Sequence, residues 1–186
     1  MAELAKQQAT YEDLLSVPSN LVAEIIYGQL HTHPRPAPKH VLAYSSLGDE
    51  LSGPFFKGRG GPGGWWILDE PELHLDSHVL VPDIAGWRRK RMPTLPETAW
   101  FELSPDWVCE ILSPSTARID RVEKLPIYAD QGVEHVWLVD PDLRTLEAFE
   151  NRGGQWLMIA ALENDNPVSV PPFDAITFDL SVLWPD

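Results

Sequence analysis

Cysteine is almost absent from this 186-residue chain, in which Cys109 is the only one. A single cysteine excludes an internal disulfide and any zinc site built from several cysteines. Long apolar runs are also missing, because none approaches the roughly 20 residues that a membrane-spanning helix needs. Residues 1–10 contain no apolar core of a secretory signal. These absences favour a cytoplasmic protein that does not enter a membrane.

Basic residues are few. The chain has 28 acidic and 14 basic residues, which gives a net charge of −14. Such a molecule repels a polyanion as a whole, and this argues against tight, sequence-independent binding to DNA. An enzyme that acts on nucleic acid can have this charge only if its basic residues are clustered and its site carries a divalent metal ion.

The remaining composition is that of a globular protein, with 44% hydrophobic and 23% charged residues. There is no internal repeat and no change of composition that would separate domains. We therefore expect one domain over residues 1–186, with residues 1–9 as a flexible or loosely packed N-terminus. Cys109 alternates with Glu110 in an apolar strand, which predicts a packed core cysteine.

Local patterns predict a mixed order of strands and helices. Apolar runs predict two strands buried on both faces, residues 106–112 and 135–140, with a helix at 120–131 between them. This order predicts a parallel crossover. Further predictions are a capped helix from Thr10, a helix at 38–51, strands within 23–31, a long strand at 65–75 with a hairpin partner at 78–87, and an antiparallel pair at 145–149 and 155–161. The fold class is therefore α/β, of α+β type, with a mixed sheet flanked by helices.

Two carboxylates stand in positions that suggest chemistry. Asp83 follows Pro82 late in a strand, and Glu110 lies inside the apolar strand of residues 106–112. An ionised glutamate in such a strand is costly unless it is paired or bound to metal. Two carboxylates that converge from neighbouring strands suit Mg²⁺ or Mn²⁺, and a nearby lysine would stabilise charge on a phosphate. The alternative for Glu110 is a structural pair with one arginine.

Several segments resemble the Uma-two family, a group of proteins assigned as endonucleases in the PD-(D/E)XK restriction-endonuclease-like superfamily. The similar segments are residues 23–30 (AEIIYGQL), 81–84 (VPDI), 108–116 (VCEILSPST), 120–124 (DRVEK) with Tyr128, and 132–141 (GVEHVWLVDP). The resemblance implies a restriction-endonuclease-like core with Asp83 and Glu110 as metal ligands on adjacent strands. It also implies DNA as the substrate, Mg²⁺ or Mn²⁺ as the cofactor, and a homodimer.

The usual superfamily lysine, two residues after the acid, is replaced here by Leu112. The resemblance places the lysine on the following helix, where Lys124 and Tyr128 have the i, i+4 spacing of one helix face. Pro126 falls between them and could kink that helix. By the same resemblance Glu24 corresponds to an early supporting acid, and His40 to a position where the family often carries histidine.

A basic run, Arg88, Arg89, Lys90 and Arg91, follows the strand that ends the predicted hairpin. It could bind phosphates at the mouth of the site, or it could be a solvated loop.

Three functions are compatible with these patterns. The first is a Mg²⁺-dependent endonuclease that hydrolyses DNA phosphodiester bonds with catalytic Asp83, Glu110 and Lys124. The second is a non-catalytic module of the same fold that binds nucleic acid or protein. The third is a hydrolase of smaller phosphate compounds, which suits the charge of −14. The first requires that the Asp83 and Glu110 carboxylates lie on one side of the sheet, close enough to share a cation.

Overall fold

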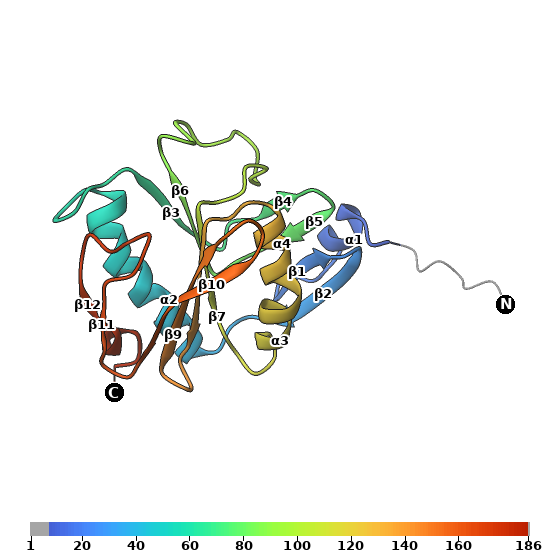
Figure 1. The fold of residues 1–186 in the computed structure, drawn as a ribbon. Helices are drawn as coiled ribbons and strands as arrows, with labels where there is room; N and C mark the ends of the chain where they lie inside the picture. The colour runs from blue at the N-terminus through green and yellow to red at the C-terminus, as the bar shows by residue number, and fades with distance from the viewer. Residues whose placement is uncertain (1–7, 186) are drawn as a thin grey trace.

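A six-stranded mixed sheet forms the centre of the molecule in the computed structural model, which describes residues 8–185 (Figure 1). Its strand order is β10-β9-β8-β7-β6-β3. The strands are β3 (Trp65–Asp69), β6 (Ile84–Arg88), β7 (Trp107–Ile111), β8 (His135–Asp140), β9 (Thr145–Asn151) and β10 (Trp156–Glu163). Strands β7 and β8 are parallel, whereas the other neighbours are antiparallel. The predicted mixed-sheet α/β class is confirmed.

A second sheet of four short strands lies beside the first, in the order β2-β1-β5-β4. Its strands are β1 (Leu21–Ile26), β2 (Gln29–Pro34), β4 (Leu73–Leu75) and β5 (His78–Leu80). Helix α1 (Tyr11–Leu15) precedes it and begins with the predicted capping box, in which Asp13 N–H donates to Thr10 Oγ1. Residues 1–7 of the predicted loose N-terminus lie outside the described part, and Ala9 N–H donates to Gly28 O.

The prediction of one unbroken strand at residues 65–75, with a single partner at 78–87, is wrong, because each of the two strands is divided into two. One hairpin register does run through the region, because Trp65 lies opposite Arg88 and Leu75 lies opposite His78. Pairing is interrupted in the middle, where Pro71 and Pro82 have no N–H to donate. The base of the hairpin, β3 and β6, joins the central sheet, and its tip, β4 and β5, joins the second sheet. Asp83 lies where the two sheets diverge.

Each face of the central sheet is covered by a different layer. Helix α2 (Pro38–Leu51), its π-helical extension η1 (Ser52–Phe56) and the C-terminal β11 (Pro167–Val168), β12 (Phe178–Asp179) and η3 (Leu180–Leu183) pack on one face. Trp107 and Cys109 point to this face, so Cys109 is a buried core residue as predicted. Val108 packs with Tyr128 on the opposite face, and strand alternation puts Glu110 on the side of Val108.

The crossover between β7 and β8 is a helix in three parts: α3 (Ala117–Ile119), the π-helical turn η2 (Asp120–Lys124) and α4 (Leu125–Asp130). It begins three residues earlier than predicted. Leu125 N–H donates to Asp120 O, five residues back, and this wide turn immediately precedes Pro126. Pro126 therefore occupies the first turn of α4, a position that tolerates proline. Lys124 stays on the face that meets the sheet. No helix within residues 8–185 is both long and apolar enough to cross a bilayer.

Candidate active site

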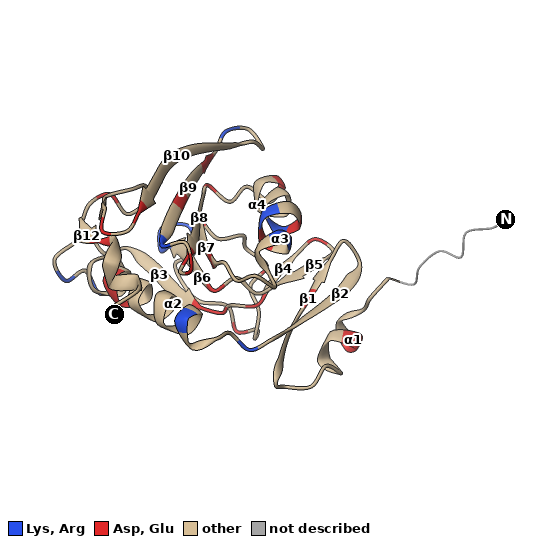
Figure 2. Cartoon of the chain, turned by 90° about the horizontal axis from the view of Figure 1, so that it is seen from below, with Lys and Arg blue, Asp and Glu red and all other residues tan. Residues whose placement is uncertain are grey.

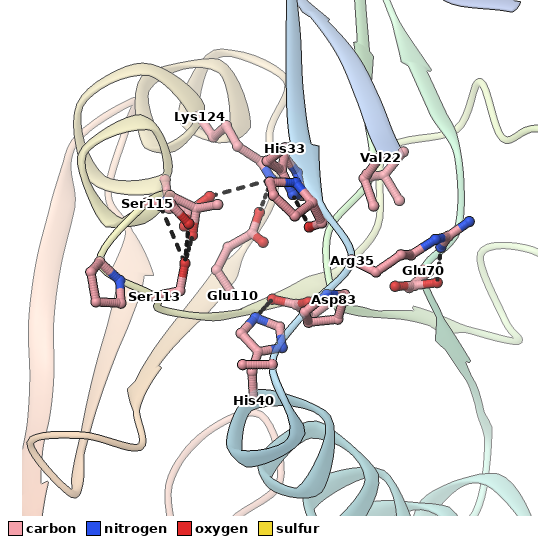
Figure 3. A pocket seen from close by; sticks show the side chains of 17 residues that line it. Val22, His33, Arg35, His40, Glu70, Asp83, Glu110, Ser113, Ser115 and Lys124 are labelled. Atoms are coloured by element: carbon pink, nitrogen blue, oxygen red, sulfur yellow. Dashed lines mark hydrogen bonds and ion pairs between the residues drawn. The ribbon is translucent and has the colours of Figure 1, made fainter. Parts of the chain in front are cut away.

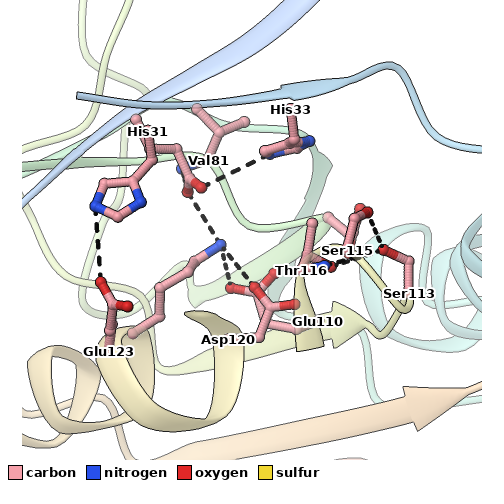
Figure 4. A network of polar contacts seen from close by, with 12 residues as sticks. His31, His33, Val81, Glu110, Ser113, Ser115, Thr116, Asp120 and Glu123 are labelled. Atoms are coloured by element: carbon pink, nitrogen blue, oxygen red, sulfur yellow. Dashed lines mark hydrogen bonds and ion pairs between the residues drawn. The ribbon is translucent and has the colours of Figure 1, made fainter. Parts of the chain in front are cut away.

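A buried lysine lies at the centre of the polar site, where it contacts Glu110 and Asp120. Figure 4 shows these two acids within the network of polar contacts. Lys124 Nζ is 2.8 Å from Glu110 Oε1, 3.0 Å from Glu24 Oε1 and 3.5 Å from Asp120 Oδ1. All four residues are at most 4% exposed. They come from η2, β7 and β1, so the cluster joins the crossover helix to both sheets. One ammonium group thus faces three carboxylates in a water-poor environment.

Glu24 is the carboxylate that the surroundings hold most firmly in its charged form. Val81 N–H donates to Glu24 Oε1 at 2.8 Å, and His33 Nε2 lies 3.8 Å from Oε2. Burial alone would raise the pKa of Glu24, but Lys124, His33 and the Val81 N–H outweigh burial and lower the pKa to about 2. Glu24 therefore acts as the permanent counterion of Lys124.

Glu110 is in the opposite situation. Tyr128 O–H donates to Glu110 Oε1 at 2.6 Å, the same oxygen that Lys124 contacts. Burial raises the pKa of Glu110 well above its ordinary value, Lys124 opposes this rise, and the charges of Asp120, Asp83 and Glu24 add to it. The pKa of Asp120 is also raised, chiefly by burial. The surroundings therefore favour the protonated form of both carboxyl groups more than water does.

Asp83 is fixed from two sides. Ile111 N–H donates to Asp83 Oδ2 at 2.7 Å, and His40 Nε2 of helix α2 lies 3.4 Å from the same oxygen. Burial lowers the pKa of His40, but contact with Asp83 raises it more, so the net shift is upward. Asp83 directly precedes Ile84, which pairs with Cys109, and this register brings Asp83 beside Glu110. Both carboxylates line one cavity of about 300 Å³ (Figure 3).

The donor atoms fit a divalent cation that is only partly held by protein. The contacts of Asp83 and Glu110 use Oδ2 and Oε1, which leaves Oδ1 and Oε2 without a hydrogen bond or ion pair among residues 8–185. Within the same residues, no set of three or more His, Cys, Asp or Glu side chains is arranged to hold a metal ion by itself. Mg²⁺ commonly binds through one or two carboxylates together with water and a substrate phosphate. The two free oxygens match that pattern.

The structure brings together six of the residues that the sequence singled out, namely Glu24, His40, Asp83, Glu110, Lys124 and Tyr128. It does not bring the basic run to them. Arg88 ends β6, at the opposite end of the strand from Asp83, and none of the residues 88–91 lines the cavity.

The basic run is largely engaged in structural contacts. Arg88 and Arg91 both contact the buried Asp106, with Nη1–Oδ1 distances of 3.0 and 3.1 Å. Arg89 lies over the Trp66 ring at 4.1 Å from its centroid and donates to backbone carbonyls. Lys90 is exposed. These contacts argue against both a phosphate grip and a merely solvated loop for the arginines; the predicted nucleic-acid contact stays a prediction.

Asp106→Ala is expected to cost about 2–3 kcal/mol of unfolding free energy, because two half-exposed arginines and the Arg88 N–H lose their acceptor. Urea denaturation measures this loss. Activity per folded molecule should stay at the parent value, since Asp106 lies outside the cavity. A variant as stable as the parent would contradict the structural role of the run.

Sequence reasoning missed three residues at the site. Asp120 has i, i+4 spacing to Lys124, and this spacing could have revealed it. His33 contacts Glu24, and it does so because β2 pairs with β1. Arg35 lines the cavity beside Asp83, but its place depends on how the second sheet meets α2, which no local pattern encodes.

Comparison with known proteins agrees with this architecture. A solved structure described as a "putative nuclease belonging to DUF820" from Anabaena variabilis matches with a TM-score of 0.76, over 95% of this chain and 97% of that one, at 24% identity. The chain therefore shares the fold of that protein. The model of the Uma2 family, described as "Putative restriction endonuclease", matches residues 9–182. This chain belongs to the Uma2 family, as its motifs predicted. No curated protein matches it in sequence.

Proposed function

We propose that this protein is a Mg²⁺- or Mn²⁺-dependent endonuclease that hydrolyses phosphodiester bonds of DNA. The observation that carries the proposal is the cavity in which Asp83 and Glu110 lie side by side with the ammonium of Lys124. Two carboxylates with free oxygens and one adjacent cationic donor are the groups that metal-assisted phosphodiester hydrolysis requires.

Asp83 and Glu110 would hold the metal ion, which when bound activates a water molecule and stabilises negative charge on the phosphate. Lys124 donates from the following helix and takes the role of the lysine that is missing at Leu112. Glu24 keeps Lys124 charged and fixes its ammonium, which is 3.0 Å from Oε1. Tyr128 orients Glu110 through its hydrogen bond, and His40 orients Asp83. These three contacts preorganise the site before substrate arrives.

A non-catalytic module that binds nucleic acid or protein is the second candidate. It is favoured by the net charge of −14 and by the structural use of the arginines in the basic run. It is opposed by the cluster itself, because burying three carboxylates around one lysine costs stability that a disused site has no reason to keep.

Cleavage of supercoiled plasmid with Mg²⁺ or Mn²⁺ separates these candidates. Asp83→Asn keeps an acceptor for Ile111 N–H but removes a metal ligand, so we expect cleavage to fall by more than about 100-fold. Asp130→Asn, on the exposed side of α4, makes the same charge change and should cleave like the parent. Equal cleavage by both variants would refute the assignment of the site. A parent protein that neither cleaves DNA nor binds Mg²⁺ by calorimetry would favour the non-catalytic module.

The homodimer implied by the family resemblance belongs to the same proposal. Light scattering of the purified protein measures its mass directly. A particle of twice the chain mass of 20.9 kDa would support it, and a particle of 20.9 kDa at working concentration would refute it.

A further inference from the structure

Arg35 occupies a position between two cavities. One is the cavity of the candidate site, and the other is a groove of about 390 Å³ beside α1. Arg35 and Glu70 line both, together with Val22 and Val81. Figure 3 shows Arg35, Glu70 and Val22 on the side of the site cavity that lies away from Ser113. The two hollows therefore adjoin, and the Arg35–Glu70 pair lies between them.

The backbone around Arg35 is stiff. Pro34, Pro36 and Pro38 surround it in the short link between β2 and α2, and proline fixes φ at each of these positions. The guanidinium spans the junction, with Nη1 3.6 Å from Glu70 Oε2 and Nη2 donating to Ser19 O at 3.2 Å. The position of the cation is thus set by the fold, while its side chain remains 57% exposed.

Arg35 can exchange its contact with Glu70 for a contact with a phosphate at little cost in stability. An exposed pair at this separation contributes little to stability, because water and salt screen it. Arginine binds phosphate more strongly, through two parallel hydrogen bonds. The first turn of α2 adds partial positive charge, because it contains no acidic residue and its Ala37 and His40 line the same cavity. Figure 2 shows basic residues in the β2–α2 link and at the start of α2. They stand in a chain whose net charge is −14.

The groove beyond Arg35 is lined by both apolar and polar side chains. Leu14, Leu15, Val17, Pro18 and Leu21 supply apolar surface, and Ser19, Glu70 and Glu72 also line it. The two carboxylates disfavour a phosphate there, so the groove offers a surface for a sugar or a base. A cation beside such a recess matches one nucleic-acid strand, in which each phosphate is followed by a less polar nucleoside.

We infer that Arg35 binds the phosphate next to the scissile one, and that the groove receives the adjoining nucleoside of a single strand. This inference rests on the proposed function and names its substrate class: a single-stranded nucleic acid or an unpaired strand end. A duplex presents many phosphates at once and needs many cations to bind tightly, which a chain of net charge −14 does not supply. A single arginine between two recesses can bind one phosphate of a single strand, with the neighbouring groups of that strand in the recesses.

Binding is measured by fluorescence anisotropy with a labelled 12-nucleotide thymidine strand and a 12-base-pair duplex, with Ca²⁺ in place of Mg²⁺. Arg35→Gln should raise the Kd for the single strand about tenfold, and Arg35→Lys should recover part of that loss. Loss of one phosphate contact should also lower the salt slope of log Kd by about 0.7. Arg152→Gln is the matched control, because Arg152 is 65% exposed and pairs with Glu150. Its Kd should stay within twofold of the parent.

The groove is tested by an exposed pair of leucines. Leu15 lines the groove and is 64% exposed, whereas Leu143 is 72% exposed and lies outside it, so both tolerate glutamine. Leu15→Gln should weaken single-strand binding about fivefold through lost apolar contact. Leu143→Gln should leave it unchanged.

Each outcome decides the inference. Equal affinities for Arg35→Gln and Arg152→Gln, a duplex bound at least as tightly as the single strand, or no binding of either oligonucleotide would overturn it. Plasmid cleavage separates the two proposals. Cleavage without Arg35-dependent binding leaves the nuclease function standing and removes the inference. Arg35-dependent binding without cleavage refutes the nuclease function and leaves Arg35 only as part of a single-strand binding site with no scissile phosphate.

Discussion

Lys124→Met is expected to abolish plasmid cleavage and to cost about 3–5 kcal/mol of unfolding free energy, the usual penalty for removing one partner of a buried ion pair. Methionine keeps the length of the side chain, so packing against the sheet changes little. The loss comes from Glu24, Glu110 and Asp120, which would then face one another without their shared cation. No other single substitution at the site leaves three buried carboxylates unpaired.

The pH dependence of that loss identifies its cause. Without Lys124 the carboxylates can relieve their repulsion by taking up protons, so the destabilisation should shrink between pH 8 and pH 5. Mg²⁺ should also stabilise the variant, because a divalent cation can replace the ammonium. Guanidinium denaturation measures both effects, and Lys57→Met, at an exposed position, is the charge-matched control. A deficit that is the same at both pH values would point to packing rather than charge.

Some parts of the site could be predicted from short stretches of the sequence. Strands β7 and β8 were predictable because apolar runs bounded by turns indicate strands buried on both faces. Lys124 and Tyr128 were predictable as neighbours because they are four residues apart on a helix, and the π-helical turn before Pro126 preserves their common direction. The resemblance to a known family supplied Asp83, which its own surroundings mark only weakly.

Other features depend on contacts between distant segments. The division of one hairpin between two sheets follows from how β5 meets β1, a pairing between residues more than fifty positions apart. Arg35 lines the cavity because it lies in the link between β2 and α2, which both border the cavity. The structural use of the basic run depends on Asp106, whose carboxylate contacts Arg88 at the end of β6 and Arg91 in the turn that follows. Periodicity within one segment does not predict contacts between segments that are distant in the sequence.

Glu110→Gln is expected to abolish cleavage and yet to stabilise the metal-free protein by about 1–3 kcal/mol, because burial and neighbouring acids disfavour the charge of Glu110 while Lys124 keeps Glu24 as its counterion. Glutamine can still accept from Tyr128 and Lys124 through Oε1. It removes the carboxylate whose pKa burial and neighbouring acids raise most clearly at the site. Stability and function should therefore change in opposite directions at this position, as is typical of groups kept for binding a metal ion.

The sign of the pH dependence follows from the two shifted glutamates. Unfolded Glu110 ionises near pH 4.3, whereas the folded, metal-free protein keeps its proton to higher pH, so stability falls as pH rises above about 4.5. Glu24, with a pKa of about 2, contributes stability above pH 4.5 that is lost as pH falls toward 2. Glu110→Gln should remove the first trend and keep the second.

Urea denaturation in EDTA at pH 5 to 8 tests this expectation, with the exposed Glu163→Gln as control. The gap between variant and parent should widen as pH rises. Mg²⁺ should stabilise the parent in proportion to its occupancy and leave the variant nearly unchanged, because a ligand stabilises only the state that binds it. A variant that is less stable than the metal-free parent at pH 8 would mean that the Glu110 carboxylate serves the fold through Lys124 rather than a cation.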